Sequence, residues 1–207
     1  MPLVDTLSNY RTSVTEANGF ISFAFQTNAT GSHLLPPNQR NFITDSAFLK
    51  IFIAWETFIE NAFINYMLGE TSIQGNNVPR YVQPVDHIHA GKVLIGTQKY
   101  VDWSNPEIIK RLSNIYFGPN NIIDSYISSA MADLFDLKTI RNAAAHLTST
   151  TQNQMVSLGN RLININNPNI SVSDLIFSFD PQSSGSITIL SSYLTKLDIL
   201  AEGIANG

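Results

Sequence analysis

Apolar residues recur at helical spacing along most of this chain. Residues 3–17 place apolar side chains three or four positions apart, which predicts an amphipathic helix. Residues 41–69 are apolar on most faces, so they predict a long helix that other elements cover on several sides. Gly69 suits the position just after the end of that helix.

Shorter helices are expected in the rest of the chain. Ser104 is the expected N-cap of a helix over residues 105–116, with Pro106 and Glu107 in its first turn and Gly118-Pro119 after its end. Ser149 to Thr151 is expected to cap the helix that follows the candidate motif described below. The other expected helices span residues 85–97, 121–131, 133–146, 151–162 and 187–204.

Loops are expected where Gly, Pro, Asn and Ser gather, over residues 28–40 and 70–83. Residues 163–185 have a similar composition and no clear pattern, and within them Ser173–Phe179 fits either a short strand or a helical turn. The sequence therefore predicts an all-α fold, an antiparallel helical bundle with additional loops and helices. The length of 207 residues favours a single domain over residues 1–207.

The composition narrows the class of protein. Only 14% of the residues are charged, and a lightly charged surface favours an oligomer. Cysteine is absent, which excludes disulfides and thiolate metal sites. The first residues lack the pattern of a signal peptide, and the longest apolar stretch contains Lys50, Glu56 and Glu60. We therefore expect a cytoplasmic protein without a membrane span.

A net charge of −4 argues against a nucleic-acid-binding coat over the whole surface, but a local positive cleft remains compatible with it. Lys138 and Arg141 lie close together in the sequence, with Arg161 on the next expected helix and Lys110 and Arg111 on a preceding one. The sequence therefore predicts that these cations line a local, positively charged cleft.

Residues 141–146 (RNAAAH) form the strongest candidate motif. On a helix, Asn142 and His146 share one face, and the long stem of Arg141 brings its guanidinium back to that face. A guanidinium fits phosphate oxygens, and an imidazole exchanges protons near neutral pH. The motif thus predicts phosphate binding with proton transfer beside it. The alternative is structural: Arg141 pairs with a carboxylate, and His146 interacts with the negative end of the helix dipole.

The segment 137–149 (LKTIRNAAAHLTS) resembles the R-N-x-x-A-H-x-S region of HEPN-domain ribonucleases, in particular bacterial groups associated with toxin–antitoxin and antiphage loci. Residues 52–60 (FIAWETFIE) resemble the long second helix of those proteins, and residues 100–106 (YVDWSNP) resemble their mid-chain connector. The resemblance covers about residues 40–165, and its diagnostic element is the R-x4-H core.

This resemblance implies a homodimer in which two R-x4-H motifs face each other and cleave single-stranded RNA without a metal or other cofactor. His146 would remove the proton of the ribose 2′-OH, Arg141 would hold the non-bridging oxygens, and Asn142 would fix the phosphate or the imidazole. The expected product is a 2′,3′-cyclic phosphate.

Four further residues are expected to support the site. Glu56 would orient Arg141 from the facing helix, because related HEPN proteins have a polar residue there. Glu60 is equally well explained as a solvated carboxylate. Lys138 and Ser149 complete the supporting set.

The resemblance further implies a toxin or antiphage effector, with an antitoxin or another operon-encoded protein as partner. Two alternatives stay open. One is a catalytically silent HEPN module that binds RNA or a nucleotide, and the other is a dimeric scaffold for a defence-operon partner.

The other polar and aromatic residues that we considered are less suited to a role in catalysis or ligand binding. His87 and His89 would point about 200° apart on a helix, which argues against a shared metal ion. Tyr100 and Trp103 either stack on a base or plug the edge of the core, and we favour the core. The hydroxyl groups of Thr148, Ser149 and Thr150 are expected to cap a helix. His33 is expected to lie in a loop without partners.

Overall fold

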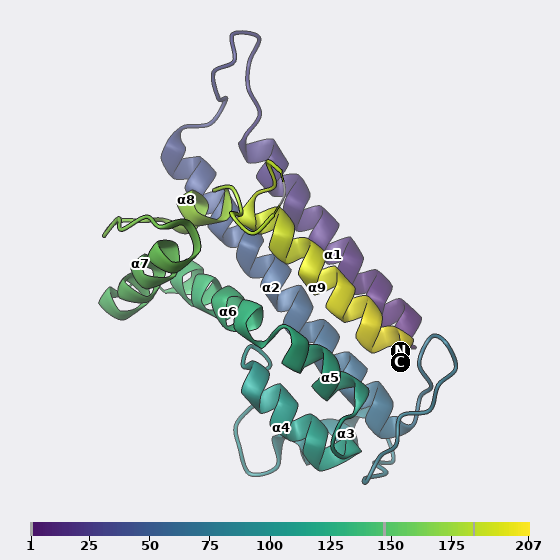
Figure 1. Cartoon of the computed structure of the whole chain (residues 1–207). Helices are drawn as coiled ribbons and strands as arrows, with labels where there is room; N and C mark the ends of the chain where they lie inside the picture. Colours follow the sequence, from purple (N-terminus) through teal and green to yellow (C-terminus); the bar gives the residue numbers. More distant parts are fainter. Residues whose placement is uncertain (1, 147, 184) are drawn as a thin grey trace. The chain divides into compact units, whose positions relative to one another are not determined.

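The regular elements in the described part of the chain are all α-helices (Figure 1). The computed structural model describes residues 2–146, 148–183 and 185–207, so Leu147 of the candidate motif segment lies outside the described residues. Within these ranges the helices are α1 (Leu3–Ala24), α2 (Pro37–Leu68), α3 (His87–Ile95), α4 (Pro106–Phe117), α5 (Ile122–Ser129), α6 (Met131–Ala145), α7 (Ser149–Ile163), α8 (Val172–Ile176) and α9 (Ile189–Asn206). The predicted all-α class is confirmed.

Helices α1 and α2 extend furthest beyond the bounds that the sequence pattern indicated. Helix α1 continues to Ala24, because buried Ala17, Ile21 and Ala24 extend its apolar stripe beyond residue 17. Helix α2 begins at Pro37 rather than at residue 41. Proline is favoured at a first helical position, where no partner is available for a backbone N–H.

Helix ends depend on single side chains. Asn105, and not Ser104, caps α4, because its side-chain oxygen accepts a hydrogen bond from the N–H of Glu107 (3.0 Å). Ser104 instead donates its hydroxyl hydrogen to Asp102. Gly118 ends α4 at a φ of 85°, as the expected break requires. In the region without a clear pattern, the helical alternative is confirmed by α8.

Contacts within the chain gather into two compact units. The first contains the described residues up to Arg11, residues 55–135 and residues 197–207. The second contains residues 12–54 and the described residues from 136 to 196.

In the first unit, segments of α1, α2 and α9 lie side by side (Figure 1). The amide of Asn65 donates to the Thr6 hydroxyl (3.4 Å), and the Tyr66 hydroxyl donates to the carbonyl of Ile204 (2.5 Å). Arg11 pairs with Asp198 at 2.7 Å. These contacts make α1 antiparallel to both α2 and α9.

The core of the first unit is rich in aromatic rings from α2. Phe63 is fully buried, and its ring centroid lies 4.8 Å from that of Phe117 and 5.4 Å from that of Trp103. Trp55 packs against Tyr10 of α1, with 6.4 Å between ring centroids. Burial of such rings is a major source of folding free energy.

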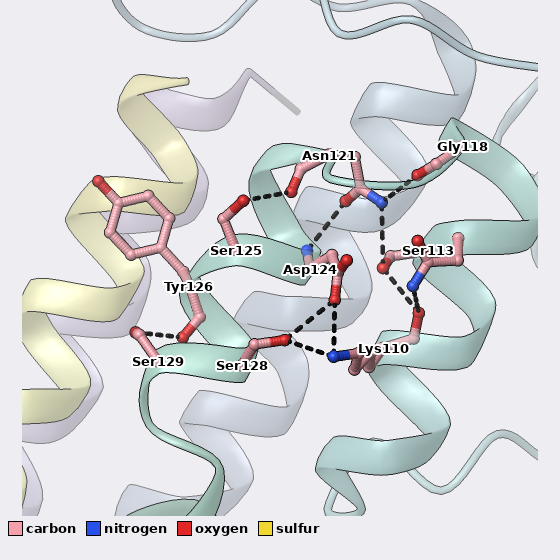
Figure 2. Close-up of polar contacts among 10 residues, drawn as sticks. Lys110, Ser113, Gly118, Asn121, Asp124, Ser125, Tyr126, Ser128 and Ser129 are labelled. Carbon is pink, nitrogen blue, oxygen red and sulfur yellow. Dashed lines mark hydrogen bonds and ion pairs between the residues drawn. The ribbon is translucent and has the colours of Figure 1, made fainter.

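Polar contacts join α4 to α5 in the same unit (Figure 2). The amide of Asn121 donates to the carbonyl of Gly118 (2.7 Å) and to the hydroxyl of Ser113 (3.3 Å). Its side-chain oxygen accepts from the N–H of Asp124 (3.0 Å), which caps α5. The buried side chain of Asn121 thus provides hydrogen bonds that stabilise the connection between the two helices.

In the second unit, Asp136 of α6 connects three helices. Its carboxylate accepts hydrogen bonds from Arg161 of α7 and from the hydroxyl of Tyr193 of α9 (3.1 Å). Elsewhere in this unit the ring of Phe25 lies edge-on to Phe177, with 4.6 Å between centroids. No helix in the described part of the chain is long and apolar enough to cross a bilayer.

Candidate functional site

The predicted motif lies at the carboxyl end of α6, in the second unit. Helix α6 ends at Ala145, and the N–H of His146 still donates to the carbonyl of Asn142 (2.9 Å). The helical turn therefore includes the histidine, and Asn142 and His146 keep the i, i+4 relation.

The three candidate catalytic side chains differ in exposure. Arg141 and Asn142 are half-buried, and Arg141 Nη1 donates to Asn142 Oδ1 at 3.3 Å. His146 is exposed. The guanidinium is thus oriented by its neighbour, while the imidazole is open to a ligand from solvent.

The chain turns into α7 directly after the motif. Thr148 caps α7 in a capping box with Thr151, whose N–H donates to Thr148 Oγ1 (3.2 Å). The hydroxyl of Thr151 also donates to the carbonyl of His146 (2.6 Å). Ser149 is the exposed first residue of α7, so the cap lies at Thr148 and not at Ser149. These bonds connect the carbonyl of His146 to the first turn of α7.

The cations expected around the motif have different surroundings. Lys138 is half-buried on α6. Arg161 forms an ion pair with Asp136, whose carboxylate offsets its charge. Lys110 belongs to the first unit, where its ammonium donates to Ser128 (2.8 Å) and lies 3.4 Å from Asp124 (Figure 2). Arg161 and Lys110 therefore contribute less free positive charge than the sequence suggested.

Glu56 and Glu60 lie one turn apart on α2, in the part of this helix that belongs to the first unit. Glu56 is half-buried, and Glu60 is exposed. The role of Glu56 as a partner of Arg141 stays a prediction.

The remaining candidates lie apart from the motif in sequence. Trp103 is buried against Phe63, whereas Tyr100 is 69% exposed. His33 is not without partners, as its ring lies edge-on to Phe25 and its backbone forms a bridge with Thr27. Among the described residues, no group of three or more His, Cys, Asp or Glu side chains is arranged to hold a metal ion.

Asp45 of α2 is a candidate that sequence reasoning missed. It lines a cavity of about 520 Å³ in the second unit, together with Ala143 of the motif and with Thr148 and Ser149. Burial raises the pKa of the Asp45 carboxyl to about 6. The available signal was its register, because Asp45 lies three and seven positions before the buried Phe48 and Phe52.

Comparison of the chain with protein-family models, with curated proteins and with solved structures gives no match. Conclusions about function therefore depend on the residues themselves and on their geometry.

Proposed function

We propose that this protein is a metal-independent endoribonuclease of HEPN type that cleaves single-stranded RNA. The observation that supports this best is the exposed imidazole of His146, one helical turn after Asn142, whose side chain accepts a hydrogen bond from Arg141. A cation, an amide and a proton-transfer group are thereby grouped at one helix end. This is a suitable set for an anionic linkage that must lose one proton and gain another.

In the proposed reaction, His146 removes the proton of a ribose 2′-OH, and the 2′-oxygen attacks the adjacent phosphorus. The bond from phosphorus to the 5′-oxygen breaks, and that oxygen takes up a proton. The products are a 2′,3′-cyclic phosphate and a 5′-hydroxyl. Arg141 stabilises the charge that develops on the non-bridging oxygens, and Asn142 orients the phosphate. The need for a 2′-OH makes RNA the substrate.

The proposed active form is a homodimer in which two copies of the motif share one linkage. A single imidazole cannot act as base and acid in the same step, whereas two can divide these roles. The biological role that accompanies this proposal is a toxin or antiphage effector, restrained by an antitoxin or another partner protein.

The test is cleavage of a single-stranded RNA in the presence of EDTA. We expect the wild-type protein to cut the RNA and to leave intact a matched strand whose sugars lack the 2′-OH. His146→Ala and Arg141→Ala should lose cleavage while circular dichroism and dimer mass stay unchanged. His87→Ala, which removes an exposed histidine from α3, is the matched control and should retain cleavage.

Equal cleavage by wild type and His146→Ala would overturn the proposal. RNA binding by the wild type without any cleavage would instead favour the silent module. Expression in cells gives an independent readout, because the wild type should arrest growth and His146→Ala should not.

A further inference from the structure

The cavity beside the motif has the size and lining of a ligand site. Its volume of about 520 Å³ lies within the usual range for small-molecule pockets, roughly 300–1,000 Å³. Ala143 belongs to the candidate motif, and Thr148 and Ser149 follow it closely in the chain. A ligand in this cavity would therefore lie next to the proposed cleavage site. The lining residues are Asp45, Ala143, Thr148, Ser149, Gln152, Met155, Asn169, Ile170, Ser171 and Val172.

The carboxyl group of Asp45 is the only ionisable side chain among these lining residues. Its Oδ1 is buried, and no described residue donates a hydrogen bond to it. A buried acceptor without a donor is costly, and the raised pKa of about 6 reflects the same unfavourable desolvation. Above that pH the group is mainly ionised and can only accept hydrogen bonds. A ligand that donates N–H groups would remove this cost.

The rest of the lining combines apolar side chains with hydroxyl and amide groups. Met155, Ile170 and Val172 offer apolar contact, while nearby hydroxyl and amide groups can bind polar edges. The amide nitrogen of Gln152 donates to the carbonyls of Pro168 (2.9 Å) and Ile170 (3.1 Å). These two bonds hold the loop before α8 against α7 and so define one wall of the cavity.

We infer that this cavity binds a guanine base through the Asp45 carboxylate. Among the four RNA bases, only guanine presents two adjacent donors on one edge, N1–H and the N2 amino group, which match the two oxygens of a carboxylate. Because Oδ1 is buried, binding of both donors requires rotation of the carboxylate about its terminal torsion, which is broad in aspartate. Adenine, cytosine and uracil each place an acceptor there. The inference rests on the proposed function in one respect: the guanine would belong to the RNA substrate, beside the scissile linkage.

The first test is calorimetric titration at pH 7.5 with the 5′-monophosphates of guanosine, inosine and adenosine. All three share the same sugar and phosphate, so differences in affinity report the base. Inosine lacks the amino donor and should bind about tenfold more weakly than guanosine, as expected for one lost hydrogen bond to a charged group. Adenosine, which offers a ring acceptor to the carboxylate, should bind at least a hundredfold more weakly. Equal affinities, or no binding of the guanosine nucleotide, would overturn the inference.

Two variants locate the site. Asp45→Asn replaces an acceptor with a donor and should weaken guanosine monophosphate binding at least tenfold, while Asp5→Asn, an exposed aspartate on α1, should not. Ser149→Trp fills the cavity from the start of α7 and should abolish binding, whereas Asn153→Trp, one turn further along the same helix, should not. Unchanged binding by folded Asp45→Asn or folded Ser149→Trp would contradict the assignment.

The two proposals fail separately. Selective binding of the guanosine nucleotide without RNA cleavage would remove the proposed function and keep the binding site. Cleavage with no preference among the three nucleotides would keep the function and remove the site. If Asp45→Asn does not fold, the nucleotide series and the Ser149→Trp pair still decide the question.

Discussion

Polar side chains are treated differently in two regions of this protein. Between α4 and α5, Asn121 uses both its amide and its oxygen, and Lys110 has Asp124 and Ser128 as partners (Figure 2). Beside the motif in the second unit, Asp45 Oδ1 is buried without a donor from any described residue, and the His146 ring is exposed.

Buried polar groups with hydrogen-bond partners and those without them have different effects on a protein. Fully satisfied buried groups stabilise a fold and fix the packing of its elements. A buried acceptor without a donor lowers stability, and ionisable groups whose pKa values are shifted by burial are concentrated at functional sites. We therefore expect substitutions in the α4–α5 region to change stability, and substitutions around the motif to change activity.

The largest expected effect is on activity at the motif. His146→Ala should lower the rate of RNA cleavage by at least about a hundredfold, because proton transfer by a positioned imidazole is worth roughly 10²–10⁴ in rate. Since the side chain is exposed, the melting temperature should change by no more than about 2 °C. Single-turnover cleavage and thermal unfolding measure the two quantities. A large fall in melting temperature would support the structural interpretation of the histidine.

The next largest effect is on stability in the α4–α5 region. Asn121→Ala removes the cap of α5 and leaves two buried groups without a donor, so it should cost about 2–3 kcal/mol. Ser129→Ala, at an exposed position near the end of α5, should cost less than about 0.5 kcal/mol. Urea denaturation compares the two variants. Equal stability of both would show that the Asn121 contacts contribute little.

A third effect depends on pH. The folded-state pKa of Asp45, about 6, lies above the ordinary value of 3.8, so the ionised carboxyl destabilises the folded protein above pH 6. This cost decreases as the pH falls through 6 and is absent below 3.8. Asp45→Asn should therefore be more stable than wild type at pH 7.5, by on the order of 1 kcal/mol, and should lose that advantage near pH 4. Urea denaturation from pH 4 to 8 tests this, and an advantage independent of pH would refute it.

The smallest effect is expected at the Lys110–Asp124 ion pair. Lys110 is 43% exposed, and pairs of this kind contribute about 0–1 kcal/mol. Lys110→Met should therefore change the free energy of unfolding by less than about 0.5 kcal/mol, and high salt should reduce the difference. Thermal unfolding at low and high salt measures it. A loss above about 2 kcal/mol would mean that the pair is not solvent-screened.

Much of the secondary structure could be predicted because it depends on local pattern. The long apolar run predicted α2, and Gly69 and Gly118 follow α2 and α4 at positive φ. The errors were also local. The cap of α4 lay one residue from the expected serine, and α1 continued where the buried residues Ala17, Ile21 and Ala24 extend its apolar stripe. The periodicity of apolar residues does not show which of two neighbouring residues caps a helix, or at which residue the helix ends.

The sequence by itself determined the helices and the grouping of Arg141, Asn142 and His146, because a helical turn relates residues that are close in the chain. Only the tertiary structure decided that Asp45 shares a cavity with Ala143, with Thr148 and Ser149, and with residues 169–172. Burial of that carboxyl depends on segments that are distant in sequence, and no local pattern encodes which of them pack together. The exposure of His146 likewise depends on how distant segments pack, and it became known only from the structure.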